Sequence, residues 1–230
     1  MLDINNTLDL VKLKFFNEWL YTSHLYDEVE TEFHKTLTEE AIKTYVDPLK
    51  LKKDSRILDI GCDTGYFLDI MRDKGYTNMT GITLSENNAR DIRSRGHDVK
   101  EYDFSFLPQK DGYIDESVDF IFLRHTLHHS PYPIFSLIEY NRLLKQGGRM
   151  YIEVPAPDCE RKHEYNLNHY SILGIRQLDA LLQRTGFKVN AFNNIEFKLT
   201  LSEKDSENTT QVDEIYYAIV VTKSNPLDIK

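Results

Sequence analysis

The spacing of apolar residues changes near residue 56 and divides the chain into two parts. Within residues 1–48, apolar side chains recur every three or four positions, which is typical of helices that bury one face. We expect Thr38 to cap the second of these helices and Asp47-Pro48 to end it, because the residue before a proline avoids the α region. The pattern predicts a helical cap over residues 1–48.

From Arg56 onward, short apolar runs alternate with amphipathic stretches. The runs RILDI, NMTGITL, HDVKEYDF, SVDFIFL and RMYIEVP are typical of strands, and the helical segments between them end in glycine. Strands that alternate with helices form parallel sheets with right-handed crossovers. The last two apolar runs, FKVNAFNNIEFKL and EIYYAIVVTK, enclose the hydrophilic stretch SEKDSENTTQ, which predicts an antiparallel hairpin. We expect residues 49–230 to form one compact α/β domain.

Composition excludes several classes of protein. The 28 basic and 37 acidic residues give a net charge of −9, which argues against a nucleic-acid or membrane partner because both need a basic face. Two cysteines are too few for a disulfide scaffold or a cysteine-rich zinc module. We expect no secretory leader, because no basic segment precedes an apolar core in MLDINNTLDLVKLKFF, and no window of about 18 residues is apolar; the sequence predicts a cytoplasmic protein without a membrane span.

The strongest candidate for a ligand site follows the first predicted strand. In LDIGCDTG, two glycines frame a turn between a buried strand and a helix, where the backbone can approach a ligand closely and helix N–H groups can hold it. A dinucleotide site is disfavoured, because the G-x-G-x-x-G pattern is missing and Asp63 would repel a pyrophosphate. A cationic ligand is electrostatically compatible with the two carboxylates of this segment.

This segment resembles the first motif of class I S-adenosylmethionine-dependent methyltransferases, acid-x-G-x-G-x-G, with Asp63 in place of the middle glycine. The resemblance implies an α/β fold with a Rossmann-like, doubly wound sheet of seven mostly parallel strands in the order 3-2-1-4-5-7-6, the last strand antiparallel. It also implies S-adenosylmethionine as cofactor and S-adenosylhomocysteine as product. In that family the loop passes under the methionine moiety, which assigns Asp59, Gly61, Cys62, Asp63 and Gly65 to cofactor binding.

Three later segments strengthen the resemblance. GITLSENN is similar to the cyclopropane-fatty-acid-synthase-like branch, in which a threonine and an amide contact the ribose; an ordinary helix cap at Ser85 is compatible with this. In EYDFSFLP, the family pattern assigns the aspartate and the next residue to contacts with the adenine ring. The stretch LRHTLHHSP follows the fourth strand, with its arginine beside the cofactor. Together these segments assign to the cofactor Thr83, Leu84, Asn88, Asp103, Phe104 and Arg124, along one crevice at the carboxyl ends of the strands.

Histidines after the fourth and fifth strands are candidates for the base that takes a proton from the methyl acceptor. We place His125 first and His169 second, with a structural or surface role as the alternative for each. His128 and His129 are neighbours and are not expected to face the same site. The aromatic N-terminal segment and the polar loop HEYNLNHYS are candidates for the acceptor pocket, although the loop is equally compatible with an exposed connector. The substrate-binding candidates are Trp19, Tyr21, His128, His163, Tyr165, Asn168 and Tyr170.

The sequence predicts no metal site, because Cys159, His163 and His169 lack a paired C-x-x-C or H-x-x-x-H spacing. The first hypothesis for the function is a methyltransferase that acts on oxygen, nitrogen or carbon of a small-molecule acceptor. The second, a methyltransferase of a macromolecule, is disfavoured by the net charge and by LRHT where the amide- or adenine-methylating branches have an N-P-P-Y-like tetrapeptide. The third, a noncatalytic binding or regulatory protein of the same fold, stays open because Asp63 and Thr83 depart from the family pattern.

Overall fold

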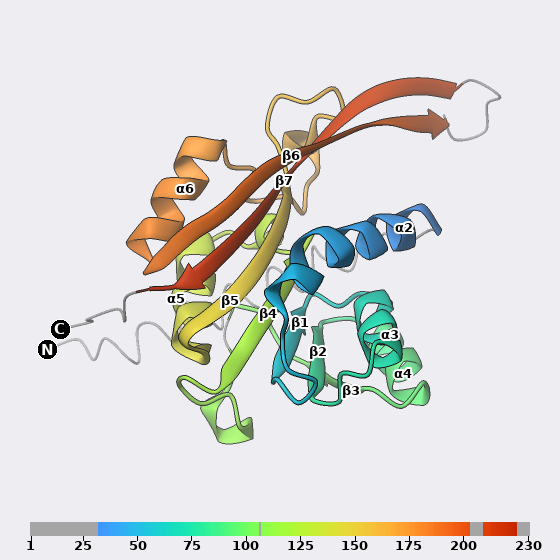
Figure 1. Ribbon diagram of the computed structural model, residues 1–230. Coiled ribbons are helices and arrows are strands. Elements are labelled where there is room, and N and C mark those ends of the chain that lie inside the picture. Colours follow the sequence, from blue (N-terminus) through green and yellow to red (C-terminus); the bar gives the residue numbers. More distant parts are fainter. Residues whose placement is uncertain (1–31, 106, 203–208, 225–230) are drawn as a thin grey trace, which may run out of the picture.

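Seven strands form a single sheet in the computed structural model, which describes residues 32–105, 107–202 and 209–224 (Figure 1). The strand order is 3-2-1-4-5-7-6, as the family resemblance implied. β1 to β5 are parallel, and β7 is antiparallel to both β5 and β6, which confirms the predicted antiparallel last strand. The strands are β1 Ile57–Ile60, β2 Met79–Thr83, β3 Asp98–Glu101, β4 Val118–Arg124, β5 Leu144–Pro155, β6 Phe187–Ser202 and β7 Thr209–Lys223.

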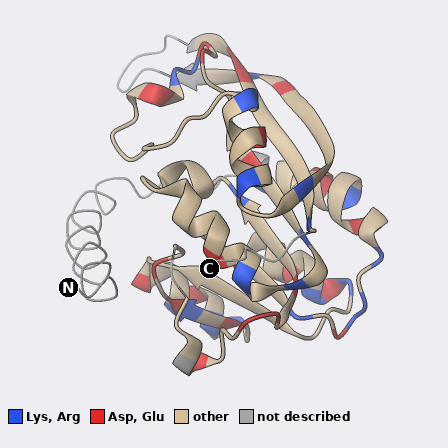
Figure 2. Cartoon of the chain, turned by 90° about the vertical axis from the view of Figure 1, so that its left-hand side faces the viewer, with Lys and Arg blue, Asp and Glu red and all other residues tan. Residues whose placement is uncertain are grey.

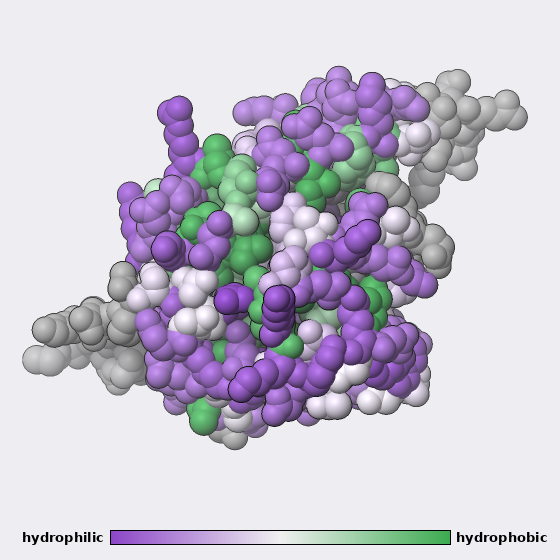
Figure 3. Space-filling model, in the orientation of Figure 1, coloured by the Kyte–Doolittle hydropathy of each residue, from purple (hydrophilic) through white to green (hydrophobic). Residues whose placement is uncertain are grey.

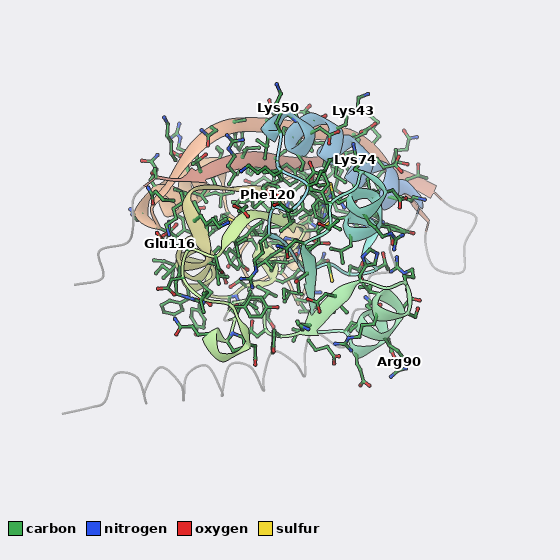
Figure 4. The ribbon with its side chains drawn as sticks, turned by 60° about the horizontal axis from the view of Figure 1, so that its bottom comes forward. Lys43, Lys50, Lys74, Arg90, Glu116 and Phe120 are labelled. Atoms are coloured by element: carbon green, nitrogen blue, oxygen red, sulfur yellow. The ribbon has the colours of Figure 1, made fainter. Side chains whose placement is uncertain are left out.

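Helices cover both faces of this sheet and bury two separate apolar clusters. One cluster packs α5 and α6 against the sheet, and the other packs α2, α3 and α4 against its opposite face. Figure 4 shows Phe120 of β4 in the interior, whereas Lys43 and Arg90 project outward. The helices are α2 Glu32–Ala41, α3 Tyr66–Asp73, α4 Glu86–Ser94, α5 Pro133–Leu143 and α6 Ile175–Arg184.

The helix predicted from Thr38 begins earlier in the structure. α2 already runs through Thr38, and a π-helical turn over Ile42–Val46 and a 3-10 turn over Asp47–Leu49 continue it. Thr38 is therefore not an N-cap: its hydroxyl donates to the His34 carbonyl oxygen at 2.9 Å, one helical turn back. The prediction failed because a threonine inside a helix can satisfy its hydroxyl within the helix, which its sequence position alone does not reveal.

The other helices are predicted to end at Gly75, Gly96, Gly147 and Gly186, and three of these four ends are confirmed. α3, α4 and α6 each end two residues before their glycine, and Gly75, Gly96 and Gly186 have φ of +88°, +87° and +82°. Ser85 caps α4 by accepting from the Asn88 N–H at 3.2 Å. α5, in contrast, ends at Leu143, before the predicted Gly147, because the chain already pairs with β4 at Leu144.

The C-terminal hairpin is longer than its apolar pattern predicted. Its pairing continues from Phe187 with Lys223 out to Ser202 with Thr209, so strand residues include part of the hydrophilic stretch assigned to the loop. In Figure 1 the distal half of β6 and β7 extends beyond the helices. Backbone pairing and a few side-chain contacts support this part, and polar side chains such as Lys198 and Asp213 are exposed there. Most of the hydrophobic surface in Figure 3 lies in the upper half, where Figure 1 places the hairpin.

A stack of aromatic rings joins the helices to the centre of the sheet. Phe67 of α3 stacks on Phe122 of β4, with ring centroids 4.0 Å apart, and Phe122 stacks on Tyr151 of β5 at 5.2 Å. Tyr151 in turn stacks on Tyr45 of the π-helical turn at 5.2 Å. The stack fixes the position of the segment that follows α2. Within the described residues, no helix is long and apolar enough to span a bilayer.

Candidate functional site

The four predicted cofactor residues at strand ends lie on one edge of the sheet. Asp59 is in β1, Thr83 ends β2, Asp103 follows β3, and Arg124 ends β4. These strands are neighbours in the order 3-2-1-4 and all run in parallel, so their carboxyl ends share one edge. Open α/β sheets bind their ligands at this edge.

The glycine turn after β1 has the conformation that its sequence predicted. Gly61 and Gly65 have φ of +76° and +81°, which favour glycine. A Cβ at Gly61 would collide with the hydroxyl group of Thr126, which donates to the Ile60 carbonyl oxygen at 2.9 Å. Gly61 therefore allows the segment after β4 to approach the turn. Cys62 is buried and lies against Gly81, where a Cβ would come within 2.8 Å of its sulfur.

Asp63 keeps the glycine-like path of the turn although it is not a glycine. Its φ is +38°, in the left-handed region that aspartate tolerates better than most residues. The Asp63 carboxylate accepts from the side-chain amide of Asn88 at 2.7 Å, which ties the turn to α4. The structure thus brings together two residues that the sequence assigned to different parts of the cofactor.

The segments after β2 and β3 contain local hydrogen bonds at the predicted positions. The Thr83 hydroxyl accepts from the Ser85 N–H at 3.1 Å, and Leu84 beside it is partly buried. The Asp103 carboxylate accepts from the Ser105 N–H at 2.8 Å, and Phe104 is buried. Each carboxylate and hydroxyl has further acceptor capacity beyond one such bond. These bonds orient the side chains and are compatible with a ligand beside them.

Arg124 lies in a buried ion-pair group. Its Nε is 2.9 Å from a carboxylate oxygen of Glu153 on β5, and its Nη1 donates to the Thr38 hydroxyl of α2 at 3.2 Å. The same Glu153 oxygen is 2.8 Å from His125 Nε2, and the other accepts from the Tyr151 hydroxyl. Burial alone would raise the pKa of Glu153, but Arg124, His125 and Tyr151 outweigh it and lower the pKa to about 2.

His125 is held in an unusual backbone conformation at the end of β4. Its φ is +51°, and its backbone N–H donates to the Glu153 carbonyl oxygen at 2.9 Å. Its ring lies against Tyr216 of β7, with centroids 4.3 Å apart. Left-handed conformations of residues other than glycine cost energy and are often found at functional sites. Glu153 therefore fixes both the backbone and the ring of His125.

A small cavity of about 100 Å³ opens beside Glu153, between α2 and the hairpin. One water molecule takes up about 30 Å³ of liquid, so this space accommodates a group of a few heavy atoms. Burial is the main factor that raises the pKa of the nearby Tyr45 phenol, which keeps it protonated near neutral pH. The cavity is lined by Leu37, Glu40, Ala41, Thr44, Tyr45, Glu153, Ile195 and Tyr216.

Several histidine rings lie next to the group formed by Arg124, His125 and Glu153. The rings of His128 and His129 have centroids 4.1 Å apart, and both contact His169, at 4.4 and 5.0 Å. The expectation that adjacent His128 and His129 cannot face the same site is therefore wrong, because they occupy a 3-10 turn over Leu127–His129 that places both rings against the loop after β5. Burial, assisted by neighbouring imidazoles, lowers the pKa of His128 well below its usual value and that of His169 to about 3.

The loop after β5 docks on the segment after β4. The backbone N–H groups of Tyr170 and Ser171 both donate to the His128 carbonyl oxygen, at 2.9 and 3.0 Å. Asn168 and His163 of this loop are buried, whereas Tyr165 is 81% exposed. Tyr170 is 40% exposed. The loop is therefore part of the site, but Tyr165 is not placed to line it. The two other acceptor candidates, Trp19 and Tyr21, lie outside the described residues.

Sequence reasoning missed four residues that the structure brings to the site: Glu153, Tyr216, Glu214 and Thr38. A glutamate within the apolar run RMYIEVP was a usable signal, because an isolated charge in a buried strand requires a partner. Glu214 of β7 accepts a hydrogen bond from His163 Nε2. Nothing in its local pattern connects it with a histidine some fifty positions earlier in the chain.

Comparisons with known proteins identify the family. Residues 31–191 match the methyltransferase domain family, so the chain belongs to this family. The chain is 26% identical over 160 residues to the 27-O-demethylrifamycin SV methyltransferase of Amycolatopsis mediterranei, covering 64% of this chain and 59% of that one. It is 25% identical over 201 residues to the tRNA U34 carboxymethyltransferase of Aliarcobacter butzleri, covering 81% of this chain and 63% of that one.

The solved structures agree on the fold. A SAM-dependent methyltransferase from Archaeoglobus fulgidus superposes with a TM-score of 0.63 at 18% identity, covering 82% of this chain and 94% of that one. The chain therefore contains a methyltransferase domain, and its fold is the Rossmann-like fold of the S-adenosylmethionine-dependent methyltransferase to which it is compared. It spans 59% and 63% of the lengths of the two curated relatives, and these differ in the acceptor that their names give.

Proposed function

We propose that the protein methylates an oxygen or nitrogen atom of a polar small molecule, with His125 as the general base. The observation that carries this proposal is the pairing of His125 with a buried carboxylate beside the small cavity. An ionised Glu153 accepts from His125 Nε2–H, so the neutral imidazole carries its basic lone pair on Nδ1. A carboxylate that orients an imidazole in this way stabilises the imidazolium formed when the ring takes a proton.

The residues predicted to hold the cofactor form a set that fits it. Asp59 is a buried carboxylate at the end of β1, and Asp63 adds a second one in the turn, which suits a ligand with an ammonium and a sulfonium group. Thr83 offers a hydroxyl for a ribose diol, and Asp103 a carboxylate for an adenine amino group. When bound, S-adenosylmethionine supplies an electrophilic methyl group on its sulfonium.

The division of roles between the histidines follows from their environments. His125 would take the proton that the acceptor loses as its oxygen or nitrogen gains the methyl group. His169 is a poorer candidate, because its pKa of about 3 makes it too weak a base near neutral pH. We assign Arg124 to positioning, because it neutralises Glu153 and joins β4 to α2 through Thr38.

Charge favours a small acceptor over the tRNA named for one group of relatives. The net charge is −9, and Figure 2 shows acidic and basic residues interspersed over the side that it presents. Binding of a polyanion depends on basic side chains that release its counterions. The cavity is also small, which suits a compact polar group. The relatives named tRNA U34 carboxymethyltransferases nevertheless make an RNA acceptor the second candidate, and the experiment below separates the two.

The test uses methyl-labelled S-adenosylmethionine with the full chain. Label is offered to a panel of small alcohols, amines and hydroxy acids, and in a separate reaction to total tRNA. We expect transfer into the small-molecule fraction. For the best acceptor, His125→Gln should lower kcat by about 100-fold or more while cofactor affinity changes by less than about threefold. His97→Gln is the matched control and should leave kcat unchanged, because His97 pairs with Asp69 of α3 and precedes β3, at the opposite edge of the sheet from His125.

Two outcomes would contradict the proposal. Transfer to tRNA alone would establish the second candidate. Unchanged kcat in His125→Gln with a confirmed small acceptor would remove the histidine from catalysis. Asp103→Ala provides the separate test of the cofactor assignment, because the loss of an adenine contact should weaken S-adenosylmethionine binding by about tenfold without altering the fold. Equal affinity in this variant would contradict that assignment.

A further inference from the structure

Three histidines from two loops place their ring nitrogens together at the carboxyl edge of the sheet. One ligand atom from each of His128, His129 and His169 lies within 4.8 Å of the other two. The first two histidines follow β4, and the third belongs to the loop after β5. We propose that these three side chains bind one divalent transition-metal ion, with Zn²⁺ the best match to an all-imidazole set.

Backbone hydrogen bonds hold this cluster together on both sides. The His128 carbonyl oxygen accepts from the N–H groups of Tyr170 and Ser171, which fixes the residue next to His169. The Ser171 hydroxyl also donates to the Ser130 carbonyl oxygen at 2.6 Å. The three rings are therefore positioned by the fold and do not depend on side-chain contacts alone for their arrangement. Such preorganisation lowers the cost of binding an ion.

The hydrogen bond of His129 has the form found around metal-binding histidines. Its Nδ1 is 2.9 Å from the Asn168 carbonyl oxygen. A carbonyl oxygen can only accept, so Nδ1 carries the proton and Nε2 the lone pair of the neutral ring. Histidines that bind metals commonly donate their second N–H to a carbonyl or carboxylate in this way, which fixes the tautomer and the ring orientation.

A second and independent observation comes from His128. This side chain is 97% buried, as its exposed fraction is 3%, and its Nδ1 has no hydrogen-bond partner among the described residues. An imidazole nitrogen left without a partner in a buried position costs free energy. A metal ion would supply the missing interaction.

Binding would bring the three ligand nitrogens, now within 4.8 Å of one another, closer together. Around a tetrahedral zinc with Zn–N bonds of about 2.0 Å, the ligand nitrogens lie roughly 3.3 Å apart. No carboxylate is placed within the cluster, and the nearest titratable rings are His125, 6.3 Å from His128, and His163, 5.3 Å from His169. Three protein ligands leave a fourth position for water or for an oxygen or nitrogen atom of a small ligand, as in catalytic zinc sites.

A neighbouring group of possible ligands is less suited to a metal ion. Cys159, His163 and Glu214 also lie within 4.8 Å of one another. In that group His163 and Glu214 already bond to each other, and the Arg161 guanidinium is 4.0 Å from the second oxygen of Glu214. This hydrogen bond already occupies one nitrogen of His163 and one oxygen of Glu214, and the nearby arginine opposes a cation. This group serves as the internal comparison in the experiment.

The experiment measures metal binding without cofactor or acceptor, so its outcome is independent of the proposed function. The full chain is stripped with a chelator and titrated with Zn²⁺ by calorimetry. We expect one Zn²⁺ per chain with Kd below about 1 µM. His129→Gln and His169→Gln should each weaken binding at least about 100-fold, with circular dichroism unchanged. His97→Gln and Cys159→Ser are the matched controls and should bind like the wild type.

Co²⁺ binding provides a second measurement, which uses only the wild-type chain and does not depend on whether a variant folds. Co²⁺ bound to the wild-type chain should give ligand-field bands without a thiolate charge-transfer band, because the site contains only imidazoles. Zn²⁺ binding weaker than about 1 µM would overturn the proposal. So would a thiolate charge-transfer band, or loss of Zn²⁺ in Cys159→Ser with retention in the two histidine variants, because either result places the ion at Cys159.

Discussion

At the scale of single residues, Asp63 shows how the chain departs from a family pattern without losing its conformation. Its φ of +38° is close to what a glycine would adopt, and its carboxylate accepts from Asn88. Asp63→Gly should therefore leave the free energy of unfolding within about 1 kcal/mol of the wild type, because relief of strain offsets the lost hydrogen bond. Asp63→Ala loses the hydrogen bond and keeps the backbone strain, so it should be about 1 kcal/mol less stable than Asp63→Gly.

Urea unfolding of the two Asp63 variants measures this difference, and S-adenosylmethionine titration shows whether the turn keeps its shape. We expect Asp63→Gly to retain cofactor affinity within about threefold. Equal stability of the alanine and glycine variants would show that the backbone conformation at this position carries no strain. The comparison is informative because the two replacements differ by one methyl group.

Residue-level predictions succeeded where a role depends on neighbours in the sequence. The serine cap at Ser85 and the positive φ at Gly61 and Gly65 follow from local geometry, which the sequence encodes directly. Thr38 and Glu153 could not be assigned in this way. Their partner Arg124 comes from a distant segment, 86 positions from Thr38, and only the folded sheet brings it to them.

At the scale of elements, Phe122 connects three of them through its two ring stacks. It contacts Phe67 of α3 and Tyr151 of β5 and is 2% exposed. Phe122→Ala should lower the free energy of unfolding by about 3–5 kcal/mol, because it removes buried apolar surface and leaves a cavity between α3 and the sheet. Chemical denaturation measures the loss. The control, Tyr165→Ala, removes an 81% exposed aromatic ring and should change stability by less than about 0.5 kcal/mol.

Elements were predictable in so far as their patterns are periodic. Strand and helix alternation from Arg56 onward gave the parallel sheet, and the strand order came from the family resemblance. The hairpin was underestimated only at its tip, where Ser202, Thr209, Thr210 and Gln211 are all polar, because a run of small polar residues is typical of a loop. The histidine cluster was missed because a 3-10 turn does not obey the helical spacing from which His128 and His129 were expected to diverge.

At the scale of the whole molecule, the site is built where separate layers meet. Four parts of the chain reach the carboxyl edge of the sheet: α2, the segment after β4, the loop after β5 and the hairpin. Glu153 contacts Arg124 and His125 at the end of β4, and it lines the cavity between α2 and the hairpin. Arg124 links that carboxylate to α2, while Tyr151 links it to the aromatic stack. The buried charge of Glu153 is therefore coupled to the stability of the entire domain.

Acid should reveal this coupling. The pKa of Glu153 is about 2 in the folded protein, against 4.5 for an unperturbed glutamate. A carboxyl whose pKa is lowered by folding stabilises the folded state above its unfolded pKa, and that contribution is lost as pH falls through the folded pKa. The contribution, roughly 3 kcal/mol by this shift, should be complete above about pH 5 and disappear between about pH 4.5 and 2.

Glu153→Gln isolates this effect from that of all other carboxylates. At pH 7 the variant should be less stable by about 3–5 kcal/mol, because Arg124 remains buried without its partner. The difference in unfolding free energy between wild type and variant should shrink steadily as pH falls from about 4.5, and urea unfolding across this range measures it. Glu196→Gln, at an exposed position of β6, is the control and should give a curve parallel to the wild type. A constant difference between the Glu153→Gln variant and the wild type down to about pH 3 would show that Glu153 does not hold its charge in the folded protein.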